Sequence, residues 1–217
     1  MKRATIIEKV IDKLRVKTIV PILSKKRREK LNSTDFTIIS NNCWGGVCYE
    51  YFNIEKKSPT IGCYFFAADF VKFCKNLKYY LKQKLVLIDS QKSIHREELH
   101  NKGEDGVIVG KLDDVEIVFL HYKDKNLILD KWQRRVKRIN YDKIILKFSY
   151  QNGCNDELIN DFLAISEYPK ICFCGEKLFQ SDDIIVFPWH DGKTTFDETI
   201  HFGKFFDVVS LINSKLN

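Results

Sequence analysis

The chain has 217 residues, of which 44% are hydrophobic and 30% are charged. This length and this apolar content fit one globular domain, or one domain with an extension, and exclude a globally disordered chain. With only 10 Gly and 4 Pro, the composition also excludes collagen-like and low-complexity proteins. The net charge of +7 suggests an anionic partner such as a nucleic acid or a membrane.

The positive charge is concentrated at the N-terminus. Residues 1–34 contain eleven Lys or Arg and three acidic residues, a net charge of +8, whereas residues 35–217 contain 25 basic and 26 acidic side chains, a net charge of −1. A nucleic-acid-binding domain usually has a basic face of its own. We therefore expect no nucleic-acid partner, and we divide the chain into a basic arm, residues 1–34, and a single α/β domain, residues 35–217.

The arm has the pattern of an amphipathic helix. Apolar residues recur at helical spacing from Ala4 to Leu14, with lysines between them, and Pro21 is expected to end or kink the helix before the basic run 25–30. This pattern is typical of a helix lying on an anionic membrane, so we expect residues 1–31 to bind the inner leaflet. The alternative is a solvated helix packed on the domain or on a partner subunit.

The cysteines and histidines do not suggest a metal site. Most of the seven cysteines lie in apolar runs, as is usual for reduced, buried cysteines of a cytoplasmic protein. There is no C-x-x-C motif, and His95 and His100 are five residues apart, not four. No apolar run approaches the roughly 18 residues of a membrane span, and no secretory signal is evident. We expect a cytoplasmic protein, peripheral on the inner face of the cell membrane.

Strand-like and helix-like segments alternate along the domain. Several of the strands are apolar without alternation, which favours an α/β three-layer sandwich with a largely parallel central sheet, preceded by the N-terminal helix. The hairpin formed by residues 106–110 and 115–122 is expected to add an antiparallel pair and make the sheet mixed. The other expected strands are 36–40, 58–66, 85–88, 143–149, 171–174 and 184–187, and the expected helices are 47–52, 69–83, 125–139, 155–162 and 202–213.

The polar loop after the first strand is the strongest candidate site. Ligands of open α/β sheets bind at the carboxyl ends of the strands, and this loop offers amides, a thiol and a Gly-Gly backbone near a helix N-terminus. Cys43 is predicted to be a catalytic nucleophile if the helix dipole lowers its pKa. The alternative is a tight strand-to-helix connection without a ligand. The other predicted substrate-binding residues of the loop are Ser40, Asn41, Asn42, Trp44, Gly45 and Gly46.

Several blocks of the chain resemble a known family. The segments FTIISNNCWGGVCYE, SPTIGCYFFAADFVKFCKNLKYYL, VGKLDDVEIVFLHY, KWQRRVKRIN and IILKFS are similar, in order and spacing, to the bacterial family called domain of unknown function 1919. The resemblance covers roughly residues 35–190 and leaves out the arm. Members of that family are often labelled exopolysaccharide biosynthesis proteins. The resemblance thus implies a three-layer α/β domain and a part in capsule or exopolysaccharide synthesis, but no particular reaction.

The block KWQRRVKRIN contributes a second group of candidates. On a helix, Lys131, Arg134, Arg135 and Arg138 fall at positions i, i+3, i+4 and i+7, which places them in one cationic stripe. Convergent arginines suit a phosphate or pyrophosphate, which activated sugars and lipid-linked sugars carry. A solvated surface helix is the alternative. The predicted substrate-binding residues of this block are Trp132, Arg134, Arg135 and Arg138.

A base is expected at the end of a strand. His121 ends the run VEIVFLHY, where strand ends of such sheets face the site, and His190 with Asp191 is a weaker candidate. Asp113 and Asp114 either shape the hairpin turn or orient a histidine or a sugar hydroxyl. The predicted catalytic residues are therefore Cys43, His121 and Asp114.

Three functions remain open at this point. The first is an acyltransferase of sugar hydroxyls, slightly favoured, and the second is a glycosyltransferase that uses a diphosphate-activated sugar. The third is a non-catalytic glycan-binding or partner-binding component of the synthesis machinery. We expect a sugar or lipid-linked sugar substrate and no resident cofactor, with acyl-CoA or a nucleotide sugar as the donor.

Overall fold

The computed structural model describes residues 5–177 and 179–216. Their elements are, in chain order, α1 (Ile6–Arg28), β1 (Thr37–Ser40), α2 (Trp44–Phe52), α3 (Ala67–Lys75), α4 (Leu77–Lys82), β2 (Val86–Asp89), the 3-10 helix η1 (Ser90–Lys92), α5 (Arg96–Asn101), β3 (Ile108–Leu112), β4 (Val115–Phe119), α6 (Lys125–Val136), the 3-10 helix η2 (Tyr141–Lys143), β5 (Ile144–Ser149), α7 (Asp156–Leu163), β6 (Lys170–Cys174), β7 (Ile184–Val186), β8 (His190–Asp191), β9 (Thr194–Thr195) and α8 (Val208–Ser214).

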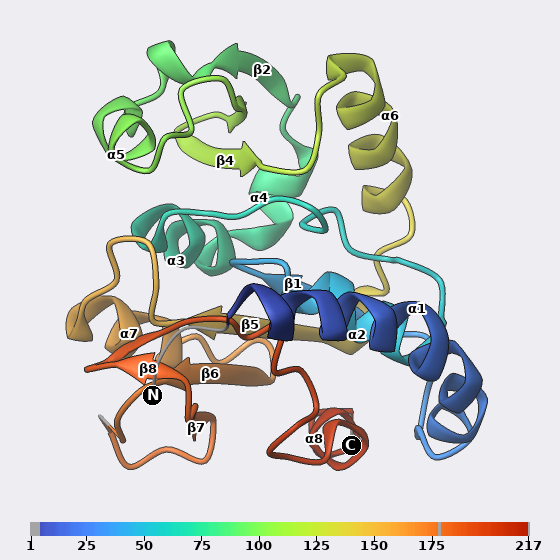
Figure 1. The fold of residues 1–217 in the computed structure, drawn as a ribbon. Helices are drawn as coiled ribbons and strands as arrows, with labels where there is room; N and C mark the ends of the chain where they lie inside the picture. The colour runs from blue at the N-terminus through green and yellow to red at the C-terminus, as the bar shows by residue number, and fades with distance from the viewer. Residues whose placement is uncertain (1–4, 178, 217) are drawn as a thin grey trace.

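The central sheet has the strand order β1-β5-β6-β7, and each neighbouring pair is parallel. This confirms the α/β class with a largely parallel central sheet. Consecutive residues of β5 point to opposite faces of the sheet. Ile144, Leu146 and Phe148 pack with α3 and α7, whereas Ile145 packs with α2 and α8. Helices therefore cover both faces of this sheet, as the expected three layers require (Figure 1).

The hairpin of β3 and β4 does not join the central sheet, contrary to expectation. It pairs with β2 in a separate antiparallel sheet, here called the second sheet. The reason is that α3 lies between the hairpin and the central sheet (Figure 1). The outer edge of β4 is closed by Tyr64, whose N–H donates to the carbonyl of Val118 (2.9 Å) and whose carbonyl accepts from the Val118 N–H (2.8 Å).

Helix α1 begins after a capping box formed by Thr5 and Glu8, and it extends beyond the proline that was expected to end or kink it. The Thr5 side chain accepts from the Glu8 N–H, and the Glu8 carboxylate accepts from the Thr5 N–H (2.7 Å). The helix continues past residue 21 to Arg28, so Pro21 does not end it. Its C-terminal part is held on α2, because the Arg28 guanidinium donates to the carbonyls of Phe52 (3.3 Å) and Asn53 (3.0 Å). No helix among the described residues is long and apolar enough to cross a membrane.

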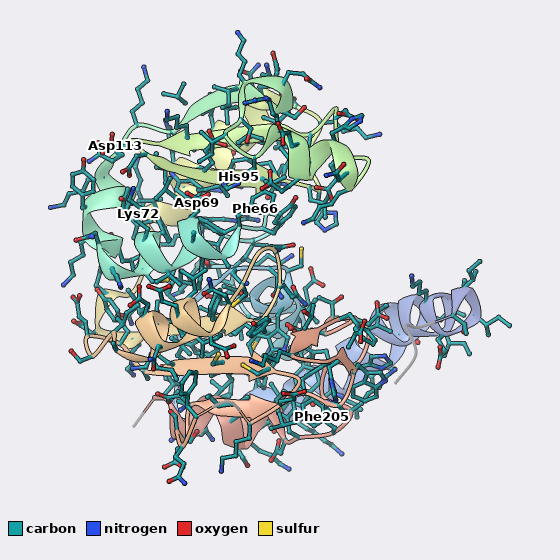
Figure 2. All side chains as sticks on the ribbon, turned by 90° about the vertical axis from the view of Figure 1, so that its left-hand side faces the viewer. Phe66, Asp69, Lys72, His95, Asp113 and Phe205 are labelled. Carbon is teal, nitrogen blue, oxygen red and sulfur yellow. The ribbon has the colours of Figure 1, made fainter. Side chains whose placement is uncertain are left out.

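Other differences from the expected elements are local. The segment 58–66 is mainly turn, with a single bridge at Tyr64. The helix expected over 69–83 is broken at Asn76, and Asp69 lies in the first turn of α3, where its carboxylate contacts His95 (Oδ2 to Nε2, 2.5 Å; Figure 2). Helix α6 ends at Val136, so Arg138 lies outside it. These shifts change which side chains reach the candidate site.

Candidate functional site

Cys43 and His121 meet although 78 residues separate them in the chain. Cys43 is the N-cap residue of α2, just after the loop that leaves β1, and His121 follows the end of β4. The Sγ atom of Cys43 lies 3.3 Å from Nε2 of His121. A thiol and an imidazole at this distance share a hydrogen bond, which is the arrangement of an activated cysteine nucleophile and its base. The structure thus brings together two of the three predicted catalytic residues.

The surroundings of Cys43 do not favour the thiolate. Burial raises the pKa of its thiol to about 11, and the nearby Glu50 carboxylate adds to the rise while the Lys147 ammonium opposes it. This is opposite to the lowering by the helix dipole that the sequence suggested. The thiol is therefore neutral near pH 7 and depends on His121 to take its proton when it reacts.

Two cavities meet at Cys43. The polar cavity, about 300 Å³, is lined by amides and carboxylates, among them Asn42, Gln151, Asn152, Asp197 and Glu198. The basic cavity, also about 300 Å³, is lined by Lys56, Lys131, Arg135, Glu50, Tyr122 and His121. Cys43 lines both. The thiol is thus accessible from two chemically different spaces, one rich in hydrogen-bonding groups for hydroxyls and one rich in cations for phosphates.

A buried ion pair lies beneath the polar cavity. Lys147 comes from the middle of β5, on the same face as Ile145, and its ammonium contacts the carboxylate of Glu198. Their side chains are 0% and 2% exposed. The pair is compatible with burial because its remaining hydrogen-bonding groups are also satisfied. Glu198 accepts from Ser149 Oγ (2.9 Å), from Gln151 Nε2 (3.2 Å) and from Thr195 Oγ1 (2.6 Å).

The ion pair also fixes the loop that carries Cys43. Asn42 donates from Nδ2 to Glu198 (3.0 Å), and its Oδ1 accepts from Lys147 Nζ (3.2 Å). The same Oδ1 accepts from the backbone N–H of Trp44 (3.1 Å), in the first turn of α2. Asn42 therefore links the ion pair to Trp44 at the start of α2. Since Asn42 and Trp44 are the two chain neighbours of Cys43, these bonds hold the backbone on both sides of the thiol. Burial lowers the pKa of Lys147, against the opposing effect of Glu198.

Helix α6 contributes two cationic residues, Lys131 and Arg135, to the lining of the basic cavity. The side chain of Arg135 is mostly buried and donates to the Ile61 carbonyl (3.1 Å) and to the Tyr122 hydroxyl (3.0 Å). The ammonium of Lys131 lies 5.0 Å from the centre of the Tyr122 ring. These contacts hold two cations on one side of the cavity, close to His121. Such a site suits a phosphate or diphosphate group.

Comparison with known proteins gives the family. A family model described as "Domain of unknown function (DUF1919)" matches residues 15–214. The chain belongs to this family. The match extends beyond the 35–190 expected from the sequence blocks, and it begins inside the segment 1–34. An uncharacterized protein of Haemophilus influenzae is 26% identical over 191 residues, which cover 81% of this chain and 86% of the relative.

In this DUF1919 domain, several of the candidates from the loop after β1 are buried and take part in packing. Ser40, Asn41 and Trp44 are buried, and the Trp44 ring packs against Phe173 (5.6 Å) and Phe202 (5.2 Å). A Cβ on Gly45 would lie 3.1 Å from Ile38 Cγ2, and one on Gly46 would lie 3.1 Å from Ile61 Cγ2. The glycines thus allow α2 to pack closely. Gly46 and Asn42 also line a cavity.

The cationic stripe of the DUF1919 domain is divided in the structure. Of the four residues of the predicted stripe, only Lys131 and Arg135 line the basic cavity. Arg134 pairs with Asp130 (3.6 Å), and Arg138, beyond the end of α6, pairs with Glu55 (3.1 Å). Trp132 is buried against Phe119, with ring centres 6.4 Å apart. The predicted phosphate contacts of Arg134 and Arg138 are therefore not supported by their positions.

Asp114 lies away from Cys43 and His121. It directly precedes β4, at the opposite end of the strand from His121, in the turn marked by Asp113 in Figure 2. Its carboxylate pairs with Lys72 and accepts from the Tyr80 hydroxyl (2.8 Å). The geometry assigns it to the hairpin turn rather than to the candidate site.

Lys147, Gln151 and Glu198 belong to the site but were not among the residues predicted from the sequence. One signal was available, because Lys147 interrupts the otherwise apolar strand IILKFS, and a lysine inside such a strand is rarely buried without a partner. Glu198 gives no comparable signal, since it lies in an irregular segment. Among the residues described, no group of three His, Cys, Asp or Glu is placed to hold a metal ion.

Proposed function

We propose that this protein is an acyltransferase of bacterial exopolysaccharide or capsule synthesis, which moves an acyl group from a phosphate-bearing thioester to a sugar hydroxyl. The observation that carries the proposal is the 3.3 Å contact between the Cys43 thiol and the His121 imidazole at the junction of two cavities. The polysaccharide context is supported by the resemblance of the sequence blocks alone.

The first half-reaction loads the cysteine. His121 takes the proton of the Cys43 thiol, and the sulfur attacks the thioester carbonyl carbon, while Lys131 and Arg135 hold the phosphates of the donor. The carbon–sulfur bond of the donor then breaks, and the leaving thiol takes the proton from His121. The products are the acyl–Cys43 thioester and the free thiol of the donor, such as coenzyme A.

The second half-reaction transfers the acyl group from Cys43 to a sugar hydroxyl. A sugar held by the amides and carboxylates of the polar cavity presents a hydroxyl to the acyl–Cys43 thioester. His121 takes the hydroxyl proton as the oxygen attacks, and returns it to Cys43 when the thioester bond breaks. The products are a sugar ester and the original thiol.

Glycosyl transfer is the second candidate, and the basic cavity is the observation that favours it. Lys131 and Arg135 suit the diphosphate of a nucleotide sugar as well as the phosphates of coenzyme A. This reaction needs no cysteine, so it leaves the contact between Cys43 and His121 unused. A non-catalytic glycan-binding role leaves it unused as well.

The decisive experiment is mass spectrometry of the intact protein after incubation with acetyl-CoA. We expect the mass to rise by one acetyl group, on Cys43, and expect no such rise in Cys43→Ala. Loading of His121→Ala should be at least about 100-fold slower, in line with the contribution of a general base. The matched control is Cys154→Ala, since Cys154 is partly exposed but lines neither cavity.

Acyl loading that persists in Cys43→Ala would contradict acyl transfer through this cysteine. A wild-type protein that is not loaded by acyl-CoA of any chain length would contradict it as well. In the second case, thermal stabilisation by a nucleotide sugar that is lost in Lys131→Ala would support glycosyl transfer instead.

A further inference from the structure

The first half of α1 carries a row of exposed apolar side chains. Ile6, Ile7, Val10, Ile11 and Leu14 are each more than half exposed. Because an α-helix turns about 100° per residue, these five positions fall on one side of it. Single exposed apolar residues are ordinary, but a continuous row on one helix face is an interaction surface. We call this row the apolar stripe of α1.

The stripe projects from the body on a helix that is fixed at its other end. Ser24 is buried, the Arg27 guanidinium lies 3.8 Å from the centre of the Tyr51 ring, and Arg28 binds two carbonyls at the end of α2. Figure 2 shows the first part of α1 extending beyond the body. On the other side of the helix, Glu8 lies within electrostatic range of Lys204. The apolar side is thus directed away from the domain.

The charge of this region selects the partner. The segment 1–34 has a net charge of +8. Lys9 is exposed in the same turns of the helix as the stripe, and Lys25, Lys26 and Lys30 are exposed near the other end of α1. Apolar side chains on one helix face, combined with an excess of lysine and arginine, match an anionic bilayer surface, where acyl chains and charged headgroups lie side by side.

We propose that α1 binds an anionic bilayer, with the apolar stripe inserted at the level of the headgroups. Since the C-terminal part of α1 is anchored to α2, and α2 carries Cys43 at its other end, the two cavities are held at a fixed position relative to the lipid surface. The site is thereby kept at a set distance from substrates that are attached to the membrane. The binding itself is independent of the proposed acyl transfer.

The test is co-sedimentation of the full-length protein with vesicles. We expect binding to vesicles of phosphatidylglycerol and phosphatidylcholine, weaker binding to phosphatidylcholine alone, and release by high salt. The double variant Ile7→Glu/Ile11→Glu should lower the partition coefficient at least about tenfold. The matched control is Val86→Glu/Ile94→Glu, which changes two apolar residues that are also at least half exposed, in β2 and just after η1, and should bind as the wild type does.

Equal binding of both double variants would overturn the proposal, as would a wild-type chain that stays in the supernatant. A second copy of the chain on the stripe is the other occupant, and it would appear as a dimer by light scattering without vesicles, which Ile7→Glu/Ile11→Glu would dissociate. Circular dichroism of each variant checks that the fold is kept, since the substituted side chains are exposed.

Discussion

Lys147, from the middle of β5, and Glu198 form an ion pair that is closed off from solvent. Taking two opposite charges out of water is costly, and the pair is tolerated here because Asn42, Ser149, Gln151 and Thr195 satisfy its other hydrogen-bonding groups. Through Asn42, the pair sets the position of the loop that holds Cys43.

Breaking this pair should destabilise the protein strongly. Lys147→Met leaves the Glu198 carboxylate buried without its partner, so we expect the free energy of unfolding to fall by about 3–5 kcal/mol in urea titrations. The double variant Lys147→Met/Glu198→Gln should recover part of that loss, because no unpaired charge remains. Lys72→Met, which breaks the exposed pair with Asp114, is the control and should change stability little. A similar small effect of Lys147→Met would contradict this account.

The reactivity of Cys43 should rise with pH well beyond the range of an ordinary thiol. Since the pKa of Cys43 is raised to about 11, its thiolate fraction grows about tenfold per pH unit from neutral pH to pH 10. We expect the rate of alkylation by iodoacetamide to follow this rise in a Cys154→Ala background, measured by mass spectrometry. A rate that levels off below pH 8 would show a thiol activated in the free protein.

The same shift has a consequence for stability. The unfolded chain releases the Cys43 proton at its ordinary pKa near 9, whereas the folded protein holds it until about pH 11. The contribution of the neutral thiol to the free energy of unfolding is therefore complete below pH 9 and is lost as the pH rises toward 11. Cys43→Ala should lessen the fall in stability between pH 9 and pH 11, as monitored by urea titration at each pH.

Lys131 should contribute to donor binding and Arg134 should not. Both lie on α6 and carry one positive charge, but only Lys131 lines the basic cavity. In an acyl-CoA loading assay, Lys131→Ala should raise the KM for the donor about tenfold, the effect of losing one charge-assisted hydrogen bond. Arg134→Ala should leave the KM unchanged. Equal effects of the two substitutions would indicate a general electrostatic contribution instead of a site.

Gly45 should tolerate no larger residue. In Gly45→Ala, the new Cβ would lie 3.1 Å from Ile38 Cγ2 and 3.2 Å from Ser40 Cβ, inside the contact between α2 and β1. We expect a loss of about 1–3 kcal/mol in the free energy of unfolding, typical of overpacking. The control is Gly106→Ala, where a Cβ would meet nothing within 4 Å. Equal stability of the two variants would show that the helix can shift without cost.

The sequence predicted the parts of the fold that local pattern determines. Apolar strands without alternation predicted the parallel sheet, and the polar loop after β1 with the histidine after β4 predicted two residues that are in contact. The place of the hairpin depended on α3 lying beneath it, a tertiary arrangement that no periodicity reveals. The prediction of Asp114 as a catalytic residue is not supported by its position, because Asp114 precedes β4 and His121 follows it. The five residues of the strand, each about 3.3 Å long, therefore lie between the two.

The partner of Lys147 could not be predicted from the sequence pattern either. The position of Lys147 in an apolar strand indicated a buried ammonium that needs a partner. Glu198, however, is 51 residues away in a segment with no regular structure. Only the fold determines which acidic residue meets that lysine.

Cys43 and His121 come from different parts of the molecule, the first from the central sheet's own helix α2 and the second from the end of the second sheet. A hydrogen bond of 3.3 Å to sulfur is lost when its partners separate by about one ångström more. The reactivity of the Cys43 thiol therefore depends on the position of the second sheet relative to α2 and the central sheet. Any partner or ligand that shifts one against the other will change the chemistry of Cys43 without touching it.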